Sequence, residues 1–575
     1  DGVRAWRVGE LDRDDPAVAA VDDALAIRCV VEVQDAEAAE CPAAAAHPHT
    51  RTPAHRPGRD RRLTDTRPSA RQTTDRGGPE PESTTHNVPL VFTSLLLGML
   101  IVSLGQMIFA TALPTIVADL GGVDRMSWVI TSYLLTMTIG LPVYGKLGDQ
   151  IGRKPLFIAA ILLFSAGSLL GAVAWNIDLL IASRAVQGLG GGGLMVLSQA
   201  IVADVVPARQ RGRYMGVMGA VFGLSSVLGP LLGGFFTEGP GWRWALWFNL
   251  PVCLVALVVA VVWLRLPNRG AGRRTDWPGT VLMATGTTAL ILISSWGGNR
   301  YDWTDPMILG MGALIGMCAV AFVLVELRSE HPLIPMTLFA ERNFSLSTGA
   351  GLLVGVAMFG CMAYLPTYIQ MVHGLGPTAA GLMMTPMMAG MMGTSIIVGN
   401  IVSRTGRYKW YPVVGTVIMA AGLWLIGSLE AGDTLVHLGV VLFVFGFGLG
   451  LCMQLLVLIV QNTFPITMVG TATASNNFFR QIGGTMGSAI VGSLFVSRLA
   501  DLMGERVPAA AAELGPEGAA AAETFSNGSG AANSMSPEIL AGLPGPLHDA
   551  IVGSYNDALV PIYHVVVPLI LVATV

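Results

Sequence analysis

Charged residues are scarce in this sequence. Asp, Glu, Lys and Arg together make up 13% of its 575 residues, about half the share that a typical soluble domain carries. Hydrophobic residues make up 52%, and they stand in runs of about 20, the length that crosses a bilayer as a helix. These proportions exclude an ordinary soluble domain and predict an integral membrane protein.

Cysteine pairs and catalytic motifs are also lacking. None of the six cysteines belongs to a CxxC pair, and Cys253, Cys318, Cys361 and Cys452 stand alone in apolar segments, where cysteine acts as a small apolar residue. The sequence contains no Walker A, HExxH or GxSxG motif. We therefore expect no enzyme, no metal site, no cofactor and no nucleic-acid partner.

The first 86 residues differ in composition from the rest of the chain. They are rich in Ala, Arg, Asp, Pro and Thr, show no apolar period, and contain no hydrophobic stretch of a signal peptide. Such a composition cannot bury enough apolar surface to fold. We expect residues 1–86 to be a disordered extension or, since an initiating Met is missing, sequence that is not native to the protein.

Fourteen apolar segments follow, separated mostly by short polar turns. Lipid offers no hydrogen-bond partners and the alternation of barrel strands is missing, so each segment is expected to be a transmembrane helix. The last segment looks truncated. The expected helices cover residues 88–113, 126–147, 155–175, 178–203, 213–237, 242–265, 277–297, 305–325, 344–371, 378–402, 411–429, 434–460, 472–497 and 556–575. The sequence thus predicts an all-α membrane protein.

Positive residues are shared unevenly between alternate loops. The loop at Lys146 and every second loop after it hold most of the Lys and Arg, whereas the opposite loops hold only five Arg. Cytoplasmic loops carry such an excess. We therefore expect a multi-pass protein of the inner (cytoplasmic) membrane with both termini in the cytoplasm, and an extracytoplasmic loop at residues 498–555.

Two sequence patterns recur in the two parts of the chain. The turn at residues 145–154 has a weaker copy at 399–408, and residues 207–212 have a counterpart at 465–470. Duplicated halves of this kind bind substrate at their interface near the membrane midplane. The expected division is an N-terminal six-helix half at 87–266, a two-helix insertion and linker at 267–343, and a C-terminal six-helix half at 344–575.

The turn at residues 145–154 combines glycines with charged side chains. Gly145 and Gly152 allow two helices to approach each other. Asp149 can bond either to Arg153 or to free amide groups at a helix N-terminus. The cations of this turn can alternatively serve only to set the topology.

Two arginines lie inside apolar segments. Arg184, with Gln187 on the same helical face, and Arg480 stand several residues from any segment end. A cation at such depth costs at least about 2.5 kcal/mol and must face protein or water. Arg184 either faces a central cavity or forms a structural hydrogen-bond hub. Arg480 either pairs with an acidic substrate group in that cavity, where we also place Gln106, or extends back to the membrane surface.

Small residues and a proline mark the fifth helix. Gly223, Gly229, Gly233 and Gly234 form a face for close packing, and Pro230 removes a helix hydrogen bond and favours a kink. The tenth helix differs, since it contains a methionine stripe that either contacts varied hydrophobic ligands or packs against lipid and neighbouring helices. The stripe consists of Met383, Met384, Met387, Met388, Met391 and Met392.

The motifs of these turns and helices resemble those of the major facilitator superfamily, in its fourteen-helix drug:proton antiporter (multidrug efflux) branch. The resemblance covers about residues 89–575 and implies two six-helix halves with a two-helix insertion. It further implies that Asp149 and Arg153 latch the cytoplasmic side when the protein faces outward. Arg184 would take part in proton transfer, and the motif around Pro230 would mark an antiporter.

Two positions depart from the family pattern. Gln150 replaces a common arginine, and Gly105 stands where relatives often have an Asp. No Asp or Glu lies well inside any of the first thirteen segments, so the residue that carries a proton is not identified. The missing acid favours neutral, anionic or zwitterionic substrates over a dedicated cation site.

The sequence therefore predicts a secondary active transporter that exports hydrophobic small molecules by alternating access in exchange for protons. Its partners would be these substrates, protons and the lipid bilayer, and we expect a monomer. One alternative keeps the fold but narrows the cargo to one metabolite, such as an antibiotic, a siderophore or a lipid-like molecule. Another alternative is a membrane sensor that transports nothing.

Overall fold

The computed structural model describes residues 88–122, 125–266, 276–298, 300–514, 540 and 542–574. The predicted extension at residues 1–86 lies outside this range. The described residues form helices and no β-strand. The elements are α2 (Val88–Leu120), α3 (Met126–Ile151), α4 (Arg153–Ala172), α5 (Ile177–Val205), α6 (Ala208–Glu238), α7 (Arg243–Trp263), α8 (Trp277–Trp296), α9 (Pro306–Glu326), η2 (Met336–Ala340), α10 (Arg342–His373), α11 (Pro377–Met383), α12 (Thr385–Thr405), α13 (Trp410–Ile426), α14 (Leu435–Thr463), α15 (Val469–Glu513) and α19 (Gly545–Val572).

Each of the fourteen predicted segments coincides with helical structure. Thirteen described helices are long and apolar enough to cross a membrane, and α13, with 17 residues, is a shorter apolar helix. The all-α membrane fold predicted from the sequence is therefore confirmed. One segment is divided, because α11 ends at Met383 and α12 begins at Thr385. Pro386, in the first turn of α12, has no amide hydrogen to donate to the preceding turn.

Polar side chains at the helix starts explain several of the boundaries. The side chain of Asn176 accepts a hydrogen bond from the amide of Leu179 at the start of α5. Asp276, Asp305 and Thr434 cap α8, α9 and α14 in the same way. Such caps satisfy amide groups that have no partner within their own helix, so the apolar runs begin where the sequence supplies these residues.

The predicted extracytoplasmic loop at residues 498–555 is helical at both ends. Helix α15 continues to Glu513, and α19 begins at Gly545. Leu499, Met503 and Val507 are buried at helical spacing in an apolar cluster that also contains residues of α19. This stripe stabilises helix despite the polar mean composition. The last helix therefore has 28 residues, enough to cross a membrane, although its apolar stretch looks truncated in the sequence.

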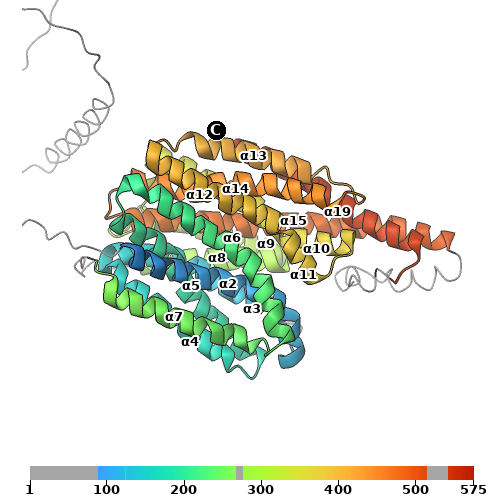
Figure 1. The fold of residues 1–575 in the computed structure, drawn as a ribbon, viewed down its shortest axis with the longest axis horizontal. Helices are drawn as coiled ribbons and strands as arrows, with labels where there is room; N and C mark the ends of the chain where they lie inside the picture. Colours follow the sequence, from blue (N-terminus) through green and yellow to red (C-terminus); the bar gives the residue numbers. More distant parts are fainter. Residues whose placement is uncertain are drawn as a thin grey trace, which may run out of the picture. The chain divides into compact units, whose positions relative to one another are not determined.

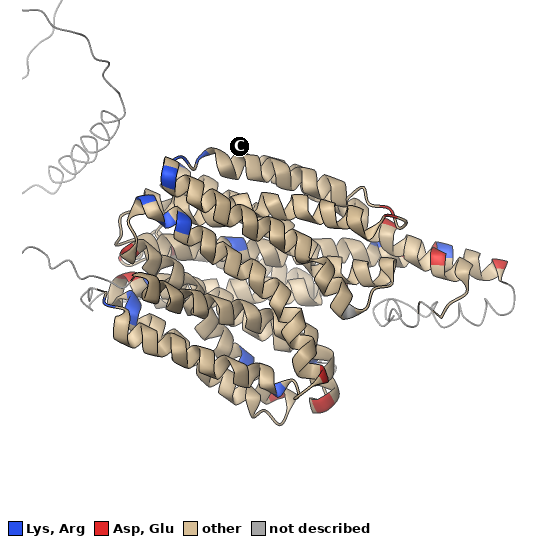
Figure 2. Ribbon diagram, viewed as in Figure 1, with Lys and Arg blue, Asp and Glu red and all other residues tan. Residues whose placement is uncertain are grey.

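The transmembrane helices pack side by side (Figure 1). Helix α3 lies against α5 and α15, and α6 lies against α2 and α12. One large apolar cluster is built mainly from α10 to α19, and another mainly from α2 to α7 with contributions from α12 and α14. Figure 2 shows Lys and Arg gathered chiefly at the left-hand end of the helices.

Candidate functional site

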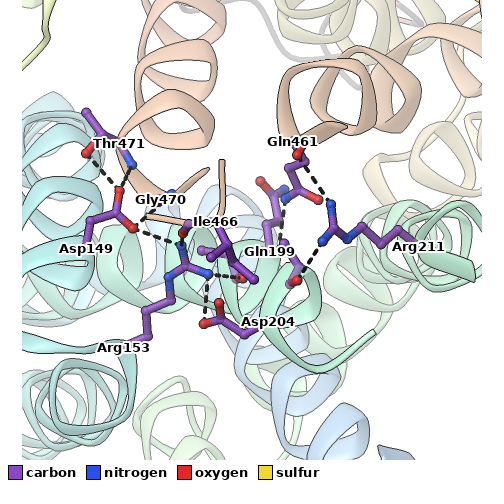
Figure 3. Close-up of polar contacts among 11 residues, drawn as sticks. Asp149, Arg153, Gln199, Asp204, Arg211, Gln461, Ile466, Gly470 and Thr471 are labelled. Atoms are coloured by element: carbon purple, nitrogen blue, oxygen red, sulfur yellow. Dashed lines mark hydrogen bonds and ion pairs between the residues drawn. The ribbon is translucent and has the colours of Figure 1, made fainter. Parts of the chain in front are cut away.

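The Asp149 carboxylate, near the end of α3, contacts the start of α15. Its Oδ2 accepts hydrogen bonds from the Thr471 amide (2.7 Å) and the Thr471 hydroxyl (2.9 Å), and its Oδ1 accepts one from the Gly470 amide (3.1 Å) (Figure 3). These amides belong to the first turn of α15, where no acceptor of the same helix reaches them. The positive end of the helix dipole also favours a carboxylate, so Asp149 joins α3 to α15.

Arg153, at the start of α4, is surrounded by acceptors and is 2% exposed. One guanidinium nitrogen lies 2.8 Å from Asp149 Oδ1 and 3.1 Å from the Ile466 carbonyl oxygen. The other lies 2.8 Å from Asp204 Oδ2 and 2.5 Å from the Ala200 carbonyl oxygen. Two carboxylates therefore neutralise this cation. We call the following group the Asp149 cluster: Asp149, Arg153, Asp204, Ile466, Gly470 and Thr471 (Figure 3).

Asp149 thus bonds both to Arg153 and to free amide groups at a helix N-terminus, the two alternatives that the sequence left open.

The glycines of the motif at residues 145–154 have separate structural roles. A Cβ atom at Gly145 would overlap the Ala474 side chain and lie 2.7 Å from the Gly470 carbonyl oxygen, so this glycine lets α3 approach α15. Gly152 has φ of +108°, which glycine adopts readily, and it separates α3 from α4.

A second group of contacts lies beside the Asp149 cluster. The Gln461 side-chain amide in α14 donates to the Gln199 carbonyl oxygen in α5 at 3.0 Å. Arg211 in α6 donates to the Gln461 carbonyl oxygen at 3.3 Å (Figure 3). It also donates to the Ala203 carbonyl oxygen at 2.8 Å and to Asn462 Oδ1 at 3.2 Å. Helices α5 and α6 are thereby joined to α14, as α3 and α4 are joined to the start of α15.

Arg184 is 1% exposed and forms the centre of a different cluster. Its guanidinium donates to Gln187 Oε1 and lies over the rings of Phe109 and Tyr133, 4.1 and 4.2 Å from their centroids. Gln187 in turn donates to the Ser168 hydroxyl at 2.8 Å. Cation–π contacts stabilise a desolvated guanidinium, so the arrangement matches the structural hub rather than a cavity-facing cation.

A central cavity of about 30 Å³ lies between α2, α3, α5, α6, α10, α14 and α15. Its volume suffices for a water molecule or two. Methionine, valine and phenylalanine form its apolar wall, and no acidic residue of the described ranges lines it. Of the predicted cavity residues, Gln106 and Arg480 line this cavity, whereas Arg184 and Gln187 do not. Its polar wall consists of Ser103, Gln106, Gln199, Gln454, Arg480 and Gln481.

Arg480 is 5% exposed and does not extend to the membrane surface. Its guanidinium donates to Asn477 Oδ1 at 2.6 Å, and the Asn477 amide donates to Gln199 Oε1 at 2.7 Å. Among the described residues no carboxylate pairs with Arg480. Arg480 therefore lines the cavity, as does Gln199, which the sequence did not single out, and the pairing of Arg480 with an acidic substrate group stays a prediction.

The motif of the fifth helix, α6, packs on two sides. Cβ atoms at Gly229 and Gly233 would press on α2, and one at Gly223 would lie 3.2 Å from Met391 in α12. Pro230 lies against Gly381 of α11, and a Cβ at Gly234 would find no atom within 4 Å. Four of the five motif residues thus belong to helix contacts, and Gly234 does not.

The methionine stripe is part of the protein core. Met384, Met387, Met388 and Met391 are buried in the apolar cluster of α10 to α19, and none of the six methionines lines the central cavity. The structure thus supports packing against neighbouring helices instead of ligand contact.

A buried acidic pair escaped the sequence argument. Glu326, at the end of α9, is 3% exposed and accepts hydrogen bonds from the amides of Leu333 (3.1 Å) and Ile334 (3.3 Å). Asp276 caps α8 through the Gly279 amide at 2.8 Å, while its buried Oδ2 has no hydrogen-bond partner in the part of the chain that the structure describes. Both residues stand at segment ends in the sequence, where acids are usually solvated, so their burial is visible only in three dimensions.

Comparison with known sequences identifies relatives along most of the chain. The family described as Major Facilitator Superfamily matches residues 95–488. An uncharacterized MFS-type transporter of Mycobacterium tuberculosis is 41% identical over 438 residues, which are 76% of this chain and 63% of that relative. The chain thus spans less than two thirds of that relative's length.

Other relatives carry names that refer to drugs. The multidrug transporter protein MdtP of Bacillus subtilis is 35% identical over 418 residues, 73% of this chain and 77% of the relative. Among solved structures, the human organic anion transporter MFSD10 matches with a TM-score of 0.56 and 16% identity, over 85% of this chain and 98% of that chain. This likeness concerns the fold alone.

Proposed function

This chain belongs to the major facilitator superfamily, and we propose that it exports hydrophobic small molecules across the cytoplasmic membrane by alternating access in exchange for protons. In this proposal the substrate crosses the membrane through a central site between two sets of helices. The finer points, namely export, proton exchange and substrate class, rest on particular residues. Relatives named as multidrug transporters and efflux pumps support export.

The Asp149 cluster is the observation that carries this proposal. It ties α3, α4 and α5 to the loop before α15 and to the start of α15 through hydrogen bonds and ion pairs. These bonds form only while the two sets of helices are close at this face. We place this face in the cytoplasm because it bears the cation-rich loops, and both chain termini would then lie on the same side. Breaking the cluster would open the central cavity to the cytoplasm.

The narrow cavity fits the same cycle. With room for a water molecule or two, it must widen before it can hold a drug-sized substrate. Separation of α3 from α15 and of α6 from α12 would widen it. The glycine-based contacts of α6 with α2 and α12 allow such sliding, because small residues let backbones approach without interlocking side chains.

Proton exchange is the most demanding part of the proposal. No carboxylate of the described residues lines the cavity, so the proton carrier would lie elsewhere or be a hydrated group. Arg184 keeps its proton under ordinary conditions and would act by orienting its neighbours. A second candidate, the dedicated exporter of one metabolite, is favoured by the same observation, since a cavity without acids suits few organic cations.

The test uses inside-out membrane vesicles with an imposed proton gradient and a pH-sensitive dye. Cationic, neutral and anionic hydrophobic compounds are added one by one, and dissipation of the gradient is recorded. Wild type is expected to dissipate the gradient with several compounds, and Asp149→Asn and Arg184→Ala are expected to reduce the response. Arg404→Gln, at an exposed position near the end of α12, serves as the control.

The outcomes separate the candidates. A response to a single compound class supports the dedicated exporter, and a response to many supports the multidrug exporter. If folded wild type gives no dissipation yet moves labelled compounds, proton exchange is wrong while transport stands. If no compound moves under any gradient, the protein is better described as a membrane sensor.

A further inference from the structure

The polar wall of the central cavity has an excess of hydrogen-bond donors. Arg480 supplies a guanidinium, which only donates. It is one of three buried arginines among the described residues, and in this part of the chain it has neither the carboxylates of Arg153 nor the stacked rings of Arg184. Among the described residues, Asn477 Oδ1 is its hydrogen-bond partner. A desolvated cation without a counter-ion is unfavourable unless an anion joins it.

The chain of amides beside Arg480 has a fixed direction. Because the guanidinium must donate, Asn477 is oriented with Oδ1 toward Arg480 and with its NH₂ group toward Gln199. Gln199 must then accept with Oε1, which leaves its own Nε2 as the free end of the chain. That atom is buried and has no hydrogen-bond partner among the described residues, while Gln199 as a whole is 0% exposed.

Arg480 and Gln199 both line this cavity, and each carries a side-chain donor group, a guanidinium and an amide NH₂. Gln454 is not tied to either orientation, because its side chain makes no hydrogen bond among the described residues and its Oε1 is buried without a partner. It can turn its amide to donate as well. Among the described residues of the lining none is acidic, so no carboxylate of the lining competes for these donors.

We propose that Arg480 and Gln199 form an anion-binding subsite, and that the preferred substrates are hydrophobic organic anions. One carboxylate or similar oxyanion accepts hydrogen bonds from Arg480 and from the Gln199 amide. The methionine and phenylalanine side chains of the lining contact the apolar body of the same molecule. This inference deepens the proposed function and rests on the same central cavity.

The experiment uses three probes that share one apolar body: pyrenebutyrate, pyrenebutanol and pyrenebutylamine, which are anionic, neutral and cationic. Binding to the purified full chain in nanodiscs is measured and corrected with empty nanodiscs. Wild type is expected to bind the acid at least about tenfold more tightly than the alcohol, as a hydrogen bond between charged groups provides. The amine is expected to bind most weakly.

Variants then assign the preference to the two donors. Arg480→Gln is expected to remove the preference for the acid while leaving alcohol binding within about twofold, and Arg480→Lys to restore part of it. Gln199→Glu keeps an acceptor for Asn477 but replaces the free NH₂ group with a negative oxygen, so the order of acid and amine is expected to reverse. Arg404→Gln is the matched surface control and is expected to bind like wild type.

Equal binding of acid and alcohol by wild type would overturn the inference. A parallel loss of all three probes in Arg480→Gln would also overturn it, because a purely structural role predicts that pattern. The gradient assay keeps the two proposals apart. Export of neutral compounds without an anion preference leaves the proposed function standing and removes the subsite. Arg480-dependent binding of the acid without any flux supports the subsite and contradicts the proposed export.

Discussion

Arg153 and Arg480 are both buried cations of this membrane protein, yet their surroundings are opposite. Arg153 contacts two carboxylates and two carbonyl oxygens, while Arg480 donates to one amide oxygen within the described part of the chain. A buried charge with full compensation holds elements of the protein together. A buried charge without compensation leaves its interaction free for a ligand. From this difference we infer that the region of Arg153 closes the cytoplasmic side and that the region of Arg480 binds the substrate.

The largest expected effect comes from exchanging each arginine for methionine. Arg153→Met leaves Asp149 and Asp204 desolvated without their cation, so we expect a loss of about 3–5 kcal/mol in the free energy of unfolding. Arg480→Met removes an uncompensated charge, so stability should stay equal or rise. Denaturant titrations of both variants in one detergent measure the difference. Equal destabilisation by the two variants would show that the two arginines do not differ in how their charges are compensated.

Asp149→Asn tests the closing region with a smaller change. The variant keeps one acceptor for the first turn of α15 but turns an NH₂ group toward donors, which costs about 1–3 kcal/mol. We expect faster hydrogen exchange at the amides of Gly470 and Thr471, read by mass spectrometry, and reduced transport with near-normal membrane insertion. The peptide around Arg480 should keep its wild-type exchange rate. Unchanged exchange and flux would contradict a closing role for Asp149.

A pair of glycine substitutions asks whether close approach at the Asp149 cluster matters. Gly145→Ala would drive a methyl group into Ala474, whereas Gly234→Ala meets no atom within 4 Å. Overpacking of this kind costs about 1–3 kcal/mol, so Gly145→Ala is expected to raise the Gly470 exchange rate roughly tenfold or more. Gly234→Ala is expected to match wild type. Identical behaviour of both variants would show that α3 and α15 tolerate the extra methyl.

The smallest effect is expected at Glu326, a buried carboxylate outside both regions. Glu326→Gln keeps an oxygen for one of the two amides, Leu333 and Ile334, and so should cost about 1 kcal/mol. Thermal unfolding in detergent measures this change, and transport is expected to remain within about twofold of wild type. A loss as large as that of Arg153→Met would place Glu326 among the residues that hold the helices closed.

The helices were predictable from the sequence, because long apolar runs and polar caps act locally. The bounds of α15 were not, since Leu499, Met503 and Val507 form their stripe within a polar stretch that becomes stable only against α19. The site was predictable in part. The motif from Gly145 to Arg153 predicted a contact of charged residues. It did not identify Thr471, the partner of Asp149, because the two residues are 322 positions apart. Gln199 gave no signal at all, because its pairing with Asn477 spans 278 positions.

Helix α15 has a mechanical consequence. It runs without interruption for 45 residues, and it contains both Thr471, which binds Asp149, and Arg480, which lines the cavity. At 1.5 Å per residue these two positions are about 14 Å apart along one axis. A hydrogen-bonded helix barely stretches over such a length, so an axial shift at one position moves the other by nearly the same amount. Opening of the Asp149 cluster and a change in the cavity wall are therefore coupled through the same helix, because a movement of α15 displaces both Thr471 and Arg480.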